Sequence, residues 1–188
     1  MVNFLHISDL HISNSLDETR VGKDTTRELL KTVLELAHTL KPEPSFLVFS
    51  GDITDKGDIE SYEYFYSVIS NSKFPSILAL GNHDDRSNFN RVFFDSFSDN
   101  PYFYTSEQGN LRIIVLDSSQ PGKVSGSICD EQFRFLEKAL SDNDAHNTLL
   151  VMHHPPWLDR DSYPWTTLDQ KSSSKLSELL DKHSVCGI

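Results

Sequence analysis

Cysteine is scarce in this chain, which has only Cys129 and Cys186 among 188 residues. Two cysteines do not build a disulfide framework, and their spacing is not that of a zinc ribbon. We therefore expect a reducing compartment, the cytoplasm. The N-terminal segment, residues 1–7, has neither a basic region nor a small-residue cleavage site, so we also expect no signal peptide.

Long apolar runs are missing as well, since no stretch approaches the roughly 18 consecutive apolar residues of a transmembrane helix. Basic residues are few: 17 Lys and Arg stand against 28 Asp and Glu, which gives a formal net charge of -11. This balance argues against a nucleic-acid-binding surface. We therefore expect no membrane and no nucleic acid among the partners.

The length of 188 residues fits one domain with a substantial core.

Short apolar runs and a hairpin pattern predict the strands. The runs are rich in branched and aromatic residues and are too short for helices. The predicted strands are Val2 to Ile7, Phe46 to Phe49, Ser76 to Leu80 and Thr148 to Met152. Segments 102–106 and 111–116 flank a Gly-Asn pair, which predicts an antiparallel hairpin.

Helical periodicity occupies most of the intervening segments. We predict helices from Asp24, as the cap, to Leu40, then Ile59 to Ile69, Ser87 to Phe97, Asp130 to Leu140 and Ser173 to Lys182. Strands alternating with helices predict an α/β core with helices on the sheet faces. The long loop from Pro155 to Gln170 holds Trp157, Tyr163 and Trp165 and is a candidate rim of the functional site.

Potential metal ligands follow four of the predicted strands. The segments are Ser8-Asp9-Leu10-His11, Ser50-Gly51-Asp52-Ile53-Thr54-Asp55, Gly81-Asn82-His83-Asp84 and His153-His154-Pro155-Pro156. In open α/β sheets, ligands bind beyond the carboxyl ends of the strands. Each segment alone also has a structural interpretation, as a turn or a capped strand end. Together they predict a metal site at one edge of the sheet.

The spacing within these segments suits metal binding. Asp9 and His11 are two residues apart, so in an extended segment both side chains point to the same side. Asp52 follows a glycine that allows a tight turn, and its two carboxylate oxygens could bridge two cations. Asn82 offers an amide oxygen, and His153 offers an imidazole nitrogen.

These motifs together resemble the calcineurin-like metallophosphoesterases, and among them the class III cyclic-nucleotide phosphodiesterases and bacterial glycerophosphodiesterases. The segment Leu116-Asp117-Ser118-Ser119-Gln120-Pro121-Gly122 is also similar to that subfamily. The resemblance covers nearly the whole chain. It implies a four-layer α/β/β/α sandwich, which accommodates the hairpin better than one flat parallel sheet.

The resemblance also implies roles for individual residues. One metal ion would be held by Asp9, His11 and Asp52, and a second by Asp52, Asn82 and His153. The pair of divalent ions, Mn, Fe, Zn or Co, would activate water for in-line attack on phosphorus. His83 is similar to the family's catalytic histidine, and Asp55 would orient it. Two further roles stay open: Asp84 supports the loop or caps the next helix, and His154 faces substrate or makes a structural hydrogen bond.

The chain departs from the family pattern at its end. Relatives carry a Gly-His-x-His motif that supplies one ligand to each metal, whereas this sequence ends at Val185-Cys186-Gly187-Ile188. We therefore expect residues 1–188 to form one metallophosphoesterase domain that lacks this segment, with weak metal binding and low or absent turnover.

The sequence is compatible with several functions. The leading hypothesis is hydrolysis of a small phosphodiester, with 3′,5′-cyclic AMP first and a glycerophosphodiester second. A phosphomonoesterase uses the same kind of metal centre. A hypothesis of another class is a catalytically inactive metal-binding or regulatory fragment. Relatives often dimerise, so a homodimer is a further expectation.

Overall fold

The computed structural model describes residues 2–14, 19–21, 24–141, 147–157, 166–183 and 185–188. Its chain divides into two compact units, which we describe separately: unit 1 comprises residues 1–78 and 83–100, and unit 2 comprises residues 79–82 and 101–188. None of the helices in the described ranges has the length and apolar character needed to cross a bilayer.

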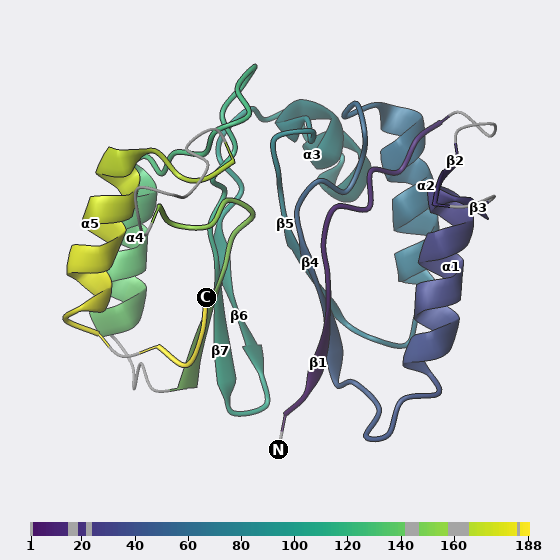
Figure 1. Ribbon diagram of the computed structural model, residues 1–188, viewed down its shortest axis with the longest axis horizontal. Coiled ribbons are helices and arrows are strands. Elements are labelled where there is room, and N and C mark those ends of the chain that lie inside the picture. Colours follow the sequence, from purple (N-terminus) through teal and green to yellow (C-terminus); the bar gives the residue numbers. More distant parts are fainter. Residues whose placement is uncertain (1, 15–18, 22–23, 142–146, 158–165, 184) are drawn as a thin grey trace. The chain divides into compact units, whose positions relative to one another are not determined.

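Unit 1 is built on a three-stranded sheet in the order β1-β4-β5. The strands are β1 (Phe4–Ile7), β4 (Phe46–Ser50) and β5 (Ser76–Ala79), and β1 runs parallel to β4 with Phe4 opposite Phe46. All five residues of β4 are buried, as expected for a central strand covered on both faces. Helices α1 (Thr26–Ala37) and α2 (Ile59–Ser70) lie along this sheet (Figure 1). The predicted strands of unit 1 are thereby confirmed to within two residues.

The start of α1 differs from its prediction. Asp24 does not cap the helix but pairs in a short hairpin of β2 (Thr19–Val21) and β3 (Asp24–Thr25), which the sequence did not indicate. Thr25 is the cap: the Glu28 backbone N–H donates to its hydroxyl at 3.2 Å, and the Glu28 carboxylate accepts from the Thr25 backbone N–H at 2.8 Å. This reciprocal pair satisfies two backbone donors at once, whereas Asp24 has no acidic residue three positions later.

Helix α3 (Arg86–Phe94) also differs from its prediction, which extended it to Phe97. Asp95 adopts a left-handed conformation with φ 50° and ψ 42°, and this ends the helix. As a result, the Phe97 side chain is 78% exposed rather than packed on the helix face. At the other end, Asp85 is the cap and its carboxylate accepts from the Asn88 backbone N–H at 2.8 Å.

Unit 2 contains a second sheet in the order β6-β7-β8. The strands are β6 (Tyr104–Gln108), β7 (Leu111–Val115) and β8 (Thr148–Val151); the first pair is antiparallel around Gly109 and the second pair is parallel. Helices α4 (Asp130–Ser141) and α5 (Gln170–Leu180) lie together along it (Figure 1). Their apolar faces and the sheet enclose a core that includes Ile114, Leu116, Leu136, Leu150 and Leu176. The predicted hairpin and α/β class are confirmed.

The open edge of β8 is lined by the last residues of the chain. The Cys186 N–H donates to the Thr148 carbonyl at 2.8 Å, and the Leu150 N–H donates to the Gly187 carbonyl at 3.0 Å. Gly187 therefore pairs with Leu149 in a parallel bridge.

His154 is a structural residue of unit 2. It is 1% exposed; its Nδ1 lies 2.8 Å from the Ser118 hydroxyl, and its Nε2 lies 2.8 Å from the Val124 carbonyl. A carbonyl can only accept, so Nε2 carries the proton and Nδ1 accepts from Ser118. Of the two roles left open for His154, the structure supports the hydrogen-bonding one.

We expect Gly126→Ala to destabilise the protein by about 1–3 kcal/mol, because the added methyl would overlap the imidazole. A Cβ built at Gly126 would lie 2.5 Å from Cγ of His154. Urea unfolding measures the change. Val124→Ala, at a half-exposed neighbouring side chain, serves as the control and should change the free energy of unfolding by less than about 0.5 kcal/mol. Equal stability of the two variants would contradict this packing.

Candidate metal centre

The loops after β1 and β4 run side by side because their backbones continue the pairing of the strands. The Asp9 N–H donates to the Gly51 carbonyl at 3.2 Å, and the His11 N–H donates to the Asp52 carbonyl at 2.9 Å. One step further, Ile12 pairs with Thr54. This ladder brings the two predicted ligand segments of unit 1 together.

Three predicted ligands have unusual backbone conformations. Asp9, His11 and Asp52 have φ angles of 56°, 47° and 50°, in the left-handed region. The prediction that Asp9 and His11 share a side because their segment is extended was therefore wrong about the backbone. Aspartate and histidine tolerate this region better than most residues, but each such residue still costs of order 1–3 kcal/mol. Strain of this kind is concentrated at functional sites.

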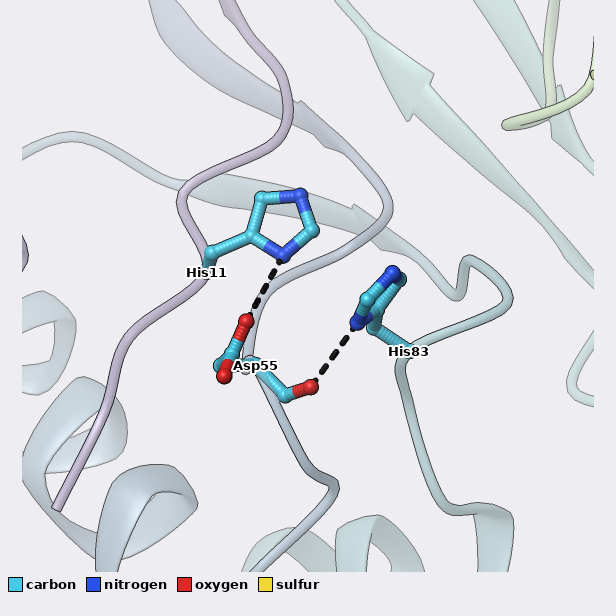
Figure 2. Close-up of side chains that lie close together, drawn as sticks. All are labelled: His11, Asp55 and His83. Carbon is cyan, nitrogen blue, oxygen red and sulfur yellow. Dashed lines mark hydrogen bonds and ion pairs between the residues drawn. The ribbon is translucent and has the colours of Figure 1, made fainter. Parts of the chain in front are cut away.

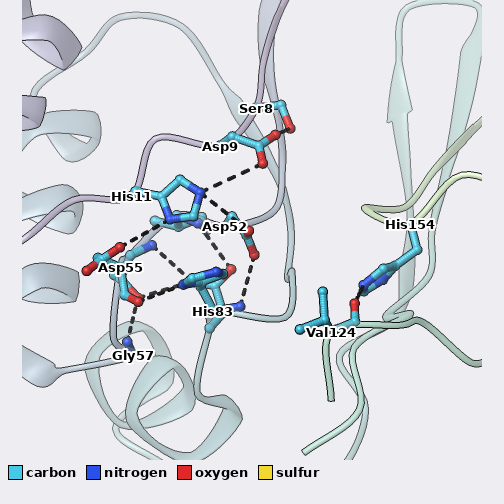
Figure 3. A network of polar contacts seen from close by, with 12 residues as sticks. Ser8, Asp9, His11, Asp52, Asp55, Gly57, His83, Val124 and His154 are labelled. Atoms are coloured by element: carbon cyan, nitrogen blue, oxygen red, sulfur yellow. Dashed lines mark hydrogen bonds and ion pairs between the residues drawn. The ribbon is translucent and has the colours of Figure 1, made fainter. Parts of the chain in front are cut away.

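The side chains nevertheless converge. Nε2 of His11 lies 3.8 Å from Oδ1 of Asp9 and 3.5 Å from Oδ2 of Asp52 (Figure 3). Two ligand atoms bound to one ion at about 2.1 Å are themselves separated by roughly 3.0–3.4 Å, so this spacing suits an ion at their centre after a small contraction. Two carboxylates and an imidazole are also a donor set for Mn, Fe, Zn or Co.

Neighbouring groups hold both carboxylates in place. The Ser8 hydroxyl donates to Oδ2 of Asp9, which leaves Oδ1 facing His11. The His83 backbone N–H donates to Oδ1 of Asp52 at 3.0 Å, while Oδ2 faces His11. Asp52 is 3% exposed. A buried carboxylate beside a second carboxylate is costly without a cation, which favours a cation at this point.

The other nitrogen of His11 faces Asp55. Nδ1 of His11 is buried and lies 3.4 Å from Oδ1 of Asp55, a long contact with no closer hydrogen-bond partner among the described residues (Figure 2). Metal-binding histidines commonly donate their second N–H to a carboxylate, which fixes the ring and the tautomer. Asp55 is placed to do this for His11.

His83 is held by the main chain of Asp55 instead. Nδ1 of His83 lies 2.8 Å from the Asp55 backbone carbonyl (Figure 2). Orientation of His83 was expected from the Asp55 carboxylate, and the structure corrects this: the carbonyl makes the contact, and the carboxylate faces His11. Because a carbonyl only accepts, the proton is on Nδ1 and Nε2 is the nitrogen available to a substrate.

A second arrangement of possible ligands exists in the same unit. One side-chain atom each from His11, Asp55 and His83 lie within 4.8 Å of one another. An ion there would have a single carboxylate to offset its charge, and Nδ1 of His83 already contacts a carbonyl. The side of His11 that faces Asp9 and Asp52 is therefore the better match for a divalent ion.

Asp84 supports the loop and does not cap the helix, which resolves its open role. Its carboxylate accepts from the backbone N–H groups of Ile53 and Thr54, both at 3.1 Å, and from the Tyr62 hydroxyl at 3.0 Å. The cap of α3 is Asp85. Tyr62 lies within the predicted helix Ile59 to Ile69, and nothing in the sequence marks a tyrosine there for a buried polar contact.

Asn82 and His153 belong to unit 2, and both side chains are half-buried. Asn82 comes after β5, and His153 comes after β8. Their convergence with Asp52 on a second ion stays a prediction. The loop from Pro155 to Gln170 was predicted to form the rim of the site. The structure describes Trp157 of this loop, whereas Tyr163 and Trp165 lie outside the described residues.

Comparison with known families identifies the chain. The profile of the calcineurin-like phosphoesterases matches residues 2–185. The chain belongs to this family. Members of the family use two divalent metal ions, in agreement with the predicted cofactors. The donor sets of unit 1 fit such ions.

Several curated relatives of this chain are named as phosphodiesterases. A probable glycerophosphodiester phosphodiesterase GpdQ of Arcobacter nitrofigilis is 35% identical over 155 residues, which cover 81% of this chain and 56% of the relative. A cAMP/cGMP dual specificity phosphodiesterase of Mycobacterium tuberculosis is 32% identical, and the match covers 81% of this chain and 49% of the relative. The 3′,5′-cyclic adenosine monophosphate phosphodiesterase CpdA of Pseudomonas aeruginosa is 29% identical, and the match covers 84% of this chain and 59% of the relative. The chain thus spans about half the length of these relatives.

The fold agrees with a solved phosphatase. The purple acid phosphatase PPD1 of yellow lupin matches with a TM-score of 0.67 at 16% identity, over 98% of this chain and 36% of the phosphatase. This likeness confirms the predicted metallophosphoesterase fold.

We expect Asp55→Asn to raise the dissociation constant for Co²⁺ about 10-fold, because an amide orients the His11 ring less well than a carboxylate does. Calorimetric titration measures this. Asp58→Asn is a matched control: it also removes one negative charge, but asparagine still caps α2, where Asp58 accepts from the Ser61 N–H at 3.0 Å. If both variants bind Co²⁺ equally well, Asp55 does not support a metal ligand.

Proposed function

We propose that this protein is a metal-dependent hydrolase of small phosphodiesters, with 3′,5′-cyclic AMP as the first candidate substrate. The observation that carries the proposal is the convergence of Asp9 and Asp52 on Nε2 of His11. Relatives named as cyclic-nucleotide phosphodiesterases support the substrate class. A net charge of -11 disfavours long polyanions such as nucleic acid.

In this proposal, Asp9, His11 and Asp52 hold one ion. Asp52, which presents Oδ2 toward His11, would also be a ligand of a second ion, for which Asn82 and His153 are the remaining candidates. Divalent ions bound there supply a water-derived nucleophile at neutral pH and offset the charge of the phosphate. The protein's own contribution is to place these ligands before the substrate arrives.

His83 is the candidate acid. Its ring is exposed, and the Asp55 carbonyl fixes Nδ1, so Nε2 is presented to solvent. When both ring nitrogens are protonated, Nε2 would donate its proton to the leaving oxygen as the bond of that oxygen to phosphorus breaks, and the hydrogen bond from Nδ1 to Asp55 keeps the ring oriented. We also assign Asp55 the support of His11, through the carboxylate.

The glycerophosphodiesters are the second candidate substrates, because another relative is named for them. Phosphomonoesters are the third candidate substrates. A different class of function is that of a non-catalytic metal-binding protein.

We place the protein in a reducing compartment such as the cytoplasm, because Cys129 and Cys186 are both free and exposed.

An assay with Mn²⁺ separates these functions. We expect turnover by residues 1–188 to be low, with kcat/KM highest for 3′,5′-cyclic AMP, lower for glycerophosphocholine and lowest for p-nitrophenyl phosphate, and with EDTA abolishing all three. A reversed order of the first two would make glycerophosphodiesters the substrate. Stoichiometric metal binding without any hydrolysis would sink the enzymatic proposal and favour the non-catalytic one.

We expect His83→Asn to lower kcat about 100-fold because it removes the candidate acid. Metal affinity should stay within about twofold, because His83 is not among the three proposed ligands of the ion held by unit 1. Initial rates and Co²⁺ titration measure the two quantities. His38→Asn changes a histidine at the end of α1 that contacts Glu43, and it should leave both unchanged. Unaltered kcat in His83→Asn would remove this residue from the mechanism.

A further inference from the structure

One carboxylate joins the loop after β4 to the loop after β5. Asp84 accepts from the Ile53 N–H through Oδ2, and from the Thr54 N–H and the Tyr62 hydroxyl through Oδ1. The Thr54 hydroxyl adds a longer contact of 3.3 Å. The two backbone donors directly follow Asp52, so Asp84 fixes the chain on the carboxyl side of that ligand.

Tyr62, on α2, is the third donor to the Asp84 carboxylate. Its side chain is fully buried, its hydroxyl donates to Asp84 at 3.0 Å, and the same oxygen accepts from the Asp85 N–H at 2.9 Å. Its ring packs edge-on against Phe89 of α3, with centroids 5.8 Å apart. One hydroxyl thus contacts both the side chain of Asp84 and the backbone that follows it.

The hydroxyl is a dependable donor. Burial, and then the negative charge of Asp84, hold the pKa of Tyr62 well above its ordinary value. The phenol therefore remains protonated at any working pH. A neutral donor aimed at a carboxylate forms a charge-assisted hydrogen bond, which is stronger than one between two neutral groups.

The loop that Tyr62 anchors is under backbone strain. Asp52 has a φ of 50°, and such a conformation persists only where the surroundings over-determine it. On one side, the Asp52 carbonyl accepts from His11 at 2.9 Å; on the other, Asp84 holds Ile53 and Thr54. The Asp52 carboxylate also accepts from the His83 N–H. The contacts made by Asp84 and His83 join the loop after β4 to the loop after β5, whereas the contact from His11 joins it to the loop after β1.

We infer that Tyr62 is a positioning residue for the metal centre, acting through Asp84 to hold Asp52 in its strained, metal-ready conformation. The inference rests on the proposed function, and it assigns a role to a residue outside all the strand-end motifs. Tyr62 lies on a helix, and its hydroxyl contacts Asp84 and the backbone of Asp85.

The test compares Tyr62→Phe with Tyr64→Phe. Both remove one hydroxyl from α2 and keep the ring, but the Tyr64 hydroxyl donates to the Arg27 carbonyl at 2.9 Å, away from Asp84. Co²⁺ affinity is measured by calorimetry, and exchange of the Ile53 and Thr54 amide protons is measured by NMR in the metal-free protein. Melting temperatures confirm that both variants are folded.

We expect the Co²⁺ dissociation constant to rise about 10-fold in Tyr62→Phe and to stay within about twofold in Tyr64→Phe. Exchange at Ile53 and Thr54 should accelerate only in Tyr62→Phe, because the loop loses its anchor. In an Asp84→Asn background, adding Tyr62→Phe should weaken binding much less than it does in the wild type, since the shared network is already broken.

Equal Co²⁺ affinity in the two tyrosine variants would overturn the inference, and so would full additivity in the Asp84→Asn background. A wild-type protein that binds no Co²⁺ contradicts the proposed function itself, and the inference falls with it. The two failures are therefore distinguishable from the wild-type titration alone.

Discussion

The site depends on the pairing of two loops beyond the ends of β1 and β4. Two backbone hydrogen bonds, from Asp9 to Gly51 and from His11 to Asp52, keep the chains in register after the regular strands end. Left-handed φ angles at Asp9, His11 and Asp52 then turn the side chains toward one point. Loss of that ladder would remove backbone contacts that hold these residues in their strained conformations.

Electrostatics explains why such an arrangement would be retained. The protein carries an excess of acid, and at the site two carboxylates approach one imidazole. A divalent ion would offset the charge of the two carboxylates. The strained backbone would then serve to hold the ligand atoms in place before the ion binds. Because an ion binds the folded chain and not the unfolded one, it would also stabilise the fold by mass action. Stability and metal binding are then coupled through the same few residues.

The sequence predicted the strands that the candidate site residues follow, but not the local geometry of those residues. Apolar runs located β4 and β8 to within a residue, because buried strands leave a strong compositional signal. Left-handed turns at Asp9 and His11 leave no such signal, since they result from pairing with another loop. The same is true of the Asp55 carbonyl, which any residue would carry, and of Tyr62, whose ring matched a core position. The cap at Thr25 is an exception, because its capping box with Glu28 is visible in the sequence although the prediction placed the cap at Asp24.

The central claim is that an ion occupies the Nε2 side of His11, between Asp9 and Asp52. Anomalous diffraction from crystals soaked in Mn²⁺ tests it most directly. The account predicts a manganese peak within about 2.3 Å of His11 Nε2, bonded to both carboxylates. A peak on the opposite side of the ring, among His11 Nδ1, Asp55 and His83, or no peak near His11 at all, would contradict it.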